Sequence, residues 1–151
     1  MRFSKNGIFR LMFSLILVTV PILVIFYFSN QTGIQSLSMS NKVSKVLRST
    51  LYMSPRKIAH IVEYAVLGGA AYTGMYIVQR RVKLSGIFVT MLLIILIASC
   101  DEINQGFVVQ RGSHISDVVI DVIGGVAGIY GFIIWKDFCR KVCCVYRNLF
   151  Y

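Results

Sequence analysis

Five of the six acidic residues in this chain lie near partners for acid–base or ligand chemistry; they are Glu63, Asp101, Glu102, Asp117 and Asp121. His60 precedes Glu63 by three residues and follows Lys57 by three, so a helix would carry them within one side. Asp117 and Asp121 are four residues apart and would share one helix face. A histidine beside a carboxylate can act as a general base, and the carboxylate can orient its ring.

The other polar residues of these stretches suit binding. Carboxylate oxygens could hold a hard divalent cation, and Arg111 and Lys57 could hold a phosphate or carboxylate group. We predict catalytic roles for His60, Glu63, Asp101, Glu102 and Asp117, and substrate-binding roles for Lys57, Gln105, Arg111 and Asp121. The set suits a lipid-linked substrate that bears phosphate. A divalent cation is the cofactor it suggests, although the residues do not identify the metal.

The elements that carry these residues are apolar enough to cross a membrane. The chain is 56% hydrophobic, and its mean hydropathy is +0.71. Four blocks are long enough to cross roughly 30 Å of hydrocarbon, at about 1.5 Å per helical residue. They are Ile8–Phe28, Ile58–Val78, Leu84–Ser99 and Val118–Trp135. We therefore predict an all-α polytopic membrane protein with four transmembrane helices and short amphipathic interfacial helices.

The blocks divide the chain into four parts. Residues 1–28 form an N-terminal transmembrane anchor, and residues 29–56 form an outer loop. Apolar residues at positions 43, 46 and 47 of that loop have helical spacing, which predicts an amphipathic helix on the membrane surface or packed on the bundle. Residues 57–135 form a three-helix core, and residues 136–151 form an amphipathic cytoplasmic tail.

Basic residues favour cytoplasmic termini. The formal net charge is +10, and basic residues flanking membrane helices explain it without a nucleic acid partner. With both termini inside, ten of the 16 basic residues face the cytoplasm and six face outward. The inner ten are Arg2, Lys5, Arg10, Arg80, Arg81, Lys83, Lys136, Arg140, Lys141 and Arg147. This multi-pass orientation in the cell membrane places the polar residues at the outer face.

The outer layer of charge admits two interpretations. An ionised side chain in lipid costs several kcal/mol, so such groups must pair or line a wet cavity. A mutually satisfied cap that holds helix ends together is one interpretation, and a functional pocket open to the outside is the other. Gly124 and Gly128 in the fourth block, and Gly68 and Gly69 in the second, are small residues that allow close helix packing.

Three ordered stretches resemble the signatures of the VanZ-like membrane proteins. They read R-K-x-x-H-x-x-E-Y-x-x-L-G from Arg56, D-E-x-x-Q-x-F from Asp101, and R-x5-D-x3-D-x2-G-x3-G from Arg111. The likeness runs from about Phe28 to Gly128. The chain departs from the family pattern in two places: Asn104 stands where a histidine is frequent, and Val109-Gln110 where Pro-Gly is frequent.

The resemblance implies a bacterial cell-envelope protein, linked by family to resistance against teicoplanin-type glycopeptides. Relatives are thought to act on lipid or lipid-linked head groups. One hypothesis is therefore an enzyme, a transferase or hydrolase, that modifies or exchanges such a head group, with His60 as base and Glu63 orienting it. The alternative is a non-catalytic protein that binds lipid, cell-wall precursor or lipoglycopeptide. The sequence does not define the oligomeric state.

Overall fold

The computed structural model describes residues 5–31, 55–80 and 84–150, with side chains described for 7–31, 56–80 and 84–144. Within these ranges the chain is all-helical, and its helices are α1 (Lys5–Ser29), α3 (Pro55–Gln79), α4 (Leu84–Gly106) and α5 (Ile115–Phe150). Each is long and apolar enough to cross a membrane. The predicted fold class is confirmed.

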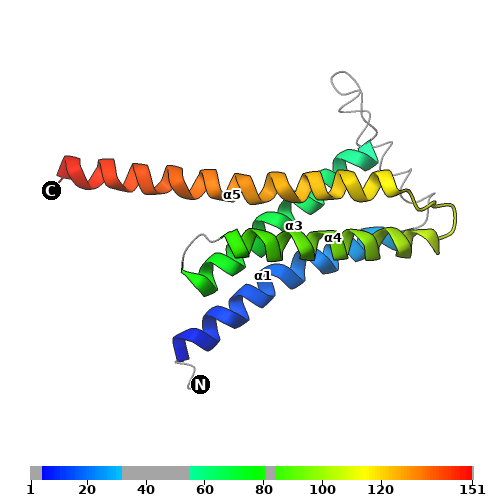
Figure 1. Ribbon diagram of the computed structural model, residues 1–151, viewed down its shortest axis with the longest axis horizontal. Coiled ribbons are helices and arrows are strands. Elements are labelled where there is room, and N and C mark those ends of the chain that lie inside the picture. Colours follow the sequence, from blue (N-terminus) through cyan, green and yellow to red (C-terminus); the bar gives the residue numbers. More distant parts are fainter. Residues whose placement is uncertain (1–4, 32–54, 81–83, 151) are drawn as a thin grey trace.

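The helices meet around α3 and α4, each of which contacts all the others, and the most extensive packing joins α3 to α5. The ends of α1 and α4 lie near the starts of α3 and α5 (Figure 1). Both chain termini lie toward the opposite end of the bundle (Figure 1). This arrangement brings the polar ends of all these helices to one end of the molecule.

Glycines set the close approach of α3 and α5. A Cβ atom on Gly124 would lie 2.6 Å from the carbonyl oxygen of Ile61, and one on Gly68 would lie 2.9 Å from the Cα atom of Gly125. A Cβ on Gly128 would collide with the backbone of α3. Small residues at such crossings let helices pack backbone to backbone in lipid. The packing role expected for these glycines agrees with the structure.

Polar contacts join α1 to α3 at the end near the termini. The Ser14 hydroxyl donates to the carbonyl oxygens of Arg10 and Gly74, at 2.8 Å and 3.0 Å. The guanidinium of Arg10 donates to the carbonyl oxygen of Ile77. These bonds satisfy polar groups inside an otherwise apolar bundle.

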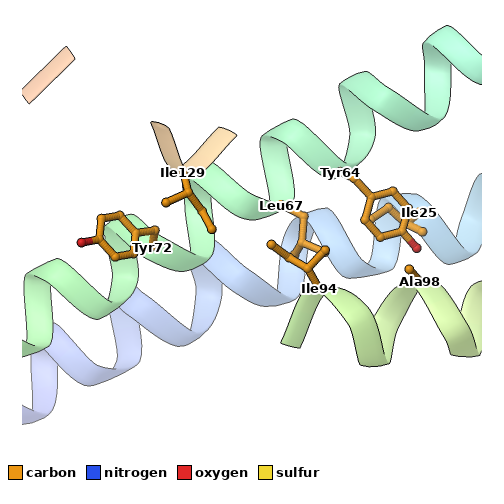
Figure 2. Packing of buried hydrophobic residues seen from close by; sticks show 7 residues of the cluster. All are labelled: Ile25, Tyr64, Leu67, Tyr72, Ile94, Ala98 and Ile129. Atoms are coloured by element: carbon orange, nitrogen blue, oxygen red, sulfur yellow. The ribbon is translucent and has the colours of Figure 1, made fainter. Parts of the chain in front are cut away.

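The centre of the bundle is apolar, as Figure 2 shows. Its buried residues come from all the described helices and are Ile25, Tyr64, Leu67, Tyr72, Ile94, Ala98 and Ile129. Large apolar side chains also cover the outside of each helix, among them Leu23, Val66, Leu96 and Ile134. An apolar exterior of this extent is what a bundle surrounded by lipid requires.

Two helices extend beyond their predicted apolar blocks. α4 continues past Ser99 to Gly106 and so carries Asp101 and Gln105 in its last turns. α5 continues past Trp135 to Phe150 without a break, so the predicted tail is a continuation of α5 and not a separate helix. The amphipathic helix predicted around residues 43–51 lies outside the described residues.

Candidate functional site

Buried polar side chains gather where α1 and α4 end and α3 and α5 begin. We call this set the polar layer; it comprises Ser29, His60, Asp101, Glu102, Gln105 and Asp121, all of them buried. His60 lies one turn before the buried Tyr64 on α3, and Asp101 lies one turn after the buried Ala98 on α4, so the layer adjoins the apolar cluster.

His60 and Asp121 form the central pair of the polar layer. Nδ1 of His60, on α3, lies 3.1 Å from Oδ1 of Asp121, on α5. His60 is 7% exposed and Asp121 is fully buried. The pair lies within one turn of the close contact between Gly124 and Ile61, so the helix crossing sets its geometry. A buried imidazole held by a carboxylate is a suitable proton acceptor.

A second chain of contacts runs from Asp101 to α3. Nε2 of Gln105 donates to Oδ2 of Asp101 at 2.9 Å, across one turn of α4. The guanidinium of Arg56 donates to Oε1 of Gln105. Gln105 thus joins an acidic and a basic group without an ion pair between them. Its amide fixes which oxygen of Asp101 remains free.

Arg111 approaches the polar layer from the loop between α4 and α5. Its Nη1 donates to the carbonyl oxygen of Ser29 at 2.6 Å, at the end of α1. Burial, followed by the positive charge of Arg56, lowers the pKa of Arg111 below its ordinary value. Two guanidinium groups that repel each other in a partly buried place favour an anion between or beside them.

Glu102 holds the start of α5. One of its oxygens accepts the backbone N–H of His114, and the hydroxyl of Ser116 donates to Asp117 at 3.2 Å. Asp117 lies in the first turn of α5. A carboxylate there interacts favourably with the helix dipole.

Asn104, at the position where relatives frequently have histidine, joins α4 to the end of α1. Its amide donates to Oδ1 of Asn30 at 2.9 Å and to the hydroxyl of Ser29 at 3.4 Å. Its hydrogen-bond partners among the described residues are therefore neutral groups at the end of α1. The contact is suited to holding the ends of α1 and α4 together.

Not all the predicted site residues come together as expected. His60, Asp101, Glu102, Gln105 and Asp121 are buried in one layer, and Arg111 reaches it. Lys57 is exposed and makes no hydrogen bond among the described side chains. Glu63 is half-buried. Among the described residues, the carboxylate hydrogen-bonded to His60 is that of Asp121 and not that of Glu63. Asp117 lies with Glu102 and His114.

Sequence reasoning missed Arg56 as a site residue. Four residues advance a helix slightly more than one turn, so Arg56 lies almost in line with His60, whereas Lys57 is rotated further away. Its place at the start of the first family-like stretch was the available signal. Ser29 was also missed, because the group that binds Arg111 is its backbone carbonyl, which no side-chain pattern can reveal.

Two groups of side chains could hold a metal ion. Ligand atoms of His60, Asp101 and Asp121 all lie within 4.8 Å of one another, and all these residues are buried. Glu102, His114 and Asp117 meet the same distance limit, but His114 is exposed and Asp117 is half-buried. Both groups combine one imidazole with two carboxylates.

Buried carboxylate oxygens of the polar layer lack partners. Within the described residues, Oδ1 of Asp101, Oε2 of Glu102 and Oδ2 of Asp121 have no hydrogen bond. Neither Arg56 nor Arg111 forms an ion pair with a carboxylate among those residues. Buried charges without partners are costly, so these oxygens are suited to binding something beyond the chain itself.

Fold and site together define a polytopic helical membrane protein with an acidic, histidine-containing polar layer at one end of its bundle. The VanZ/LLP1 family model matches residues 11–136, which is most of the chain. The protein belongs to the VanZ/LLP1 family. No curated protein and no solved structure matches it.

Proposed function

We propose that this protein acts in the bacterial cell membrane on a lipid-linked head group that bears phosphate, and that it modifies or exchanges that head group at the outer face. The observation that carries the proposal is the buried His60–Asp121 pair, 3.1 Å apart, in a layer that also receives two arginines. A layer that only held helix ends together would not need unpartnered carboxylate oxygens, which are costly to bury.

The orientation with cytoplasmic termini supports this location. Basic residues on the side of the termini outnumber those on the side of the polar layer by ten to six. The polar layer would then lie just below the outer surface of the membrane. Head groups of lipids and lipid-linked precursors are found at that depth.

Arg56 and Arg111 are suited to the phosphate. Each arginine donates one hydrogen bond to a neutral oxygen, and the Nε atoms of both arginines lack partners within the described residues. A guanidinium presents several donors in a planar fork that matches phosphate oxygens. The phosphate would therefore bind on the side of the layer formed by these arginines.

The His60–Asp121 pair would activate the incoming hydroxyl, which belongs to water or to a new head group. The hydroxyl oxygen attacks phosphorus as its proton is removed, and the bond between phosphorus and the leaving head-group oxygen breaks. That leaving oxygen then receives the proton, so each exchange consumes one hydroxyl and releases another. Positioning and proton transfer are the contributions that the buried pair can make.

The alternative is non-catalytic binding. The arginines could hold a phosphate of lipid or cell-wall precursor without any step at His60, and the bound precursor could alter access of a lipoglycopeptide drug. The family likeness links this alternative to teicoplanin resistance. It predicts that function declines gradually when contacts in the layer are weakened, without an abrupt loss at His60.

Expression in a teicoplanin-sensitive Gram-positive host tests the proposal. Wild type, His60→Gln and Asp121→Asn would be compared with Asp137→Asn, which alters a half-exposed carboxylate far along α5. Membrane abundance, extracted lipids and drug susceptibility would be measured. The proposal expects an altered lipid species with wild type and with the control. It expects at least about 100-fold less of that species with His60→Gln at equal abundance. Equal lipid profiles in all strains would refute head-group chemistry.

A further inference from the structure

Among the described residues, the buried carboxylates of the polar layer form no ion pair with the arginines that reach it. Asp101, Glu102 and Asp121 are at least 97% buried. The arginines that reach the layer donate to neutral oxygens of Gln105 and Ser29. Among the described residues, the one basic side chain paired with a buried carboxylate is His60, which is charged only when protonated. Buried carboxylate oxygens without partners are unfavourable, so these groups are suited to a positively charged ligand.

Three helices contribute to one convergent group in this layer. α3 supplies His60, α4 supplies Asp101, and α5 supplies Asp121, with ligand atoms within 4.8 Å of one another. Helices that are packed through backbone contacts form a rigid frame for such a group. The group is therefore built into the bundle and does not depend on a surface loop.

The distance between His60 and Asp121 suits shared coordination. Two ligands at about 2.0–2.2 Å from a metal ion, separated by about 90–109°, lie about 2.8–3.6 Å apart. Nδ1 of His60 and Oδ1 of Asp121 are separated by 3.1 Å. The same atoms can thus share a proton when the ion is away and share the ion when it is bound.

Buried carboxylate oxygens without hydrogen-bond partners are independent evidence for a bound ligand. Oδ1 of Asp101 and Oδ2 of Asp121 are buried and lack hydrogen bonds within the described residues. The other oxygen of Asp101 is held by Gln105 at 2.9 Å, which fixes the orientation of the carboxylate. Residues that hydrogen-bond to a metal ligand without binding the metal hold that ligand in the orientation that coordination requires.

We propose that His60, Asp101 and Asp121 bind a divalent ion of the first transition series, Zn²⁺ or Mn²⁺, inside the polar layer. One imidazole nitrogen with two carboxylates suits these ions better than Ca²⁺ or Mg²⁺, which prefer sites made entirely of oxygen. Gln105 is a positioning residue for this site. The other group, with Glu102 and His114, is more exposed and holds the start of α5.

The proposed metal site deepens the proposed function. The role of the ion in the reaction rests on that function, whereas binding of the ion does not. A bound ion acidifies a hydroxyl that coordinates it, so His60 would serve as a ligand and the ion would help remove the proton. Binding of the ion can be measured without any substrate. Failure of the metal site and failure of head-group chemistry would therefore be seen in separate experiments.

The test uses the full chain, purified in detergent and stripped with a chelator. Zn²⁺ or Mn²⁺ alone would be added, and bound ion would be measured by elemental analysis and titration calorimetry. We expect a single saturable ion and a raised melting temperature for wild type. Asp101→Asn and Asp121→Asn should weaken binding by more than the roughly 10–100-fold expected for Gln105→Leu.

Controls separate the outcomes. Asp137→Asn should bind like wild type, and His114→Gln should as well, because it alters only the other group. If a substituted protein aggregates, X-ray absorption on metal-loaded wild type and on metal-loaded His114→Gln still decides, since one imidazole with oxygen ligands is expected in both. Absence of saturable binding in wild type would overturn the proposal. Loss of the ion in His114→Gln with retention in Asp101→Asn would overturn it too.

Discussion

Nδ1 of His60 and Oδ1 of Asp121 lie 3.1 Å apart although 61 residues separate them in the chain. They belong to helices that cross through backbone contacts, with the position of a Gly124 Cβ lying only 2.6 Å from the carbonyl oxygen of Ile61. The His60–Asp121 pair and the packing contact are thus one turn apart on the same helices. Changes at the crossing should disturb the pair, and changes in the pair should leave the crossing intact.

Asp121→Asn tests the pair directly. The substitution keeps the size of the side chain but removes the charge that holds and polarises His60. We expect at least about a 100-fold loss of head-group chemistry with unchanged membrane abundance. Lipid product per unit of membrane protein is the measurement. Asp117→Asn is the matched comparison, because Asp117 lies on the same helix but not in the group with His60; an equal loss in both would contradict the assignment.

Gly124→Ala should destabilise the bundle. The new methyl group would meet the backbone of Ile61 on α3, which cannot move aside as a flexible side chain could. We expect a cost of about 1–3 kcal/mol in the free energy of unfolding. Gly131→Ala is the control on the same helix, because a Cβ there meets nothing within 4 Å.

Unfolding of both glycine variants can be followed by the fluorescence of Trp135, the one tryptophan of the chain. Gly131→Ala should be neutral or stabilising by up to about 1 kcal/mol, because alanine favours helix more than glycine does. Equal stability of the two variants would contradict the close backbone contact between α3 and α5 at Gly124.

Gln110→Gly should stabilise the loop before Arg111. Gln110 adopts φ 62°, in the left-handed region that favours glycine. Relief of the backbone strain is worth about 1 kcal/mol. A thermal melt in detergent is the measurement. Val109→Gly, at a neighbouring position without a positive φ, should not raise the melting temperature; a rise in both would point to a general effect of loop flexibility.

Arg56→Gln and Lys57→Gln are a matched pair of neighbouring substitutions. Arg56 donates to Gln105 inside the layer, whereas Lys57 is exposed. Loss of Arg56 should raise the KM for a phosphate-bearing lipid at least about 10-fold, because a charged hydrogen bond to phosphate contributes about 1.5–3 kcal/mol. Lys57→Gln should change it less than about twofold. The opposite order would return the phosphate-binding role to Lys57.

Much of the architecture followed from the sequence. Four long apolar blocks can lie only as helices across a membrane, because backbone groups in lipid must bond within their own segment. Alternating spans then place the start of α3, the end of α4 and the start of α5 at one membrane face. The depth of His60, Asp101 and Asp121 was predictable for that reason, and the family-like stretches agree with the match over residues 11–136.

Only the tertiary structure decided the partners within that face. Depth restricts one coordinate of a side chain, whereas the rotation of each helix and its crossing with neighbours determine which groups meet. The sequence suggested Glu63 as the partner of His60, and the crossing at Gly124 presents Asp121 to it. Likewise, Arg56 and not Lys57 contacts Gln105, because helix rotation turns Arg56 inward and leaves Lys57 exposed.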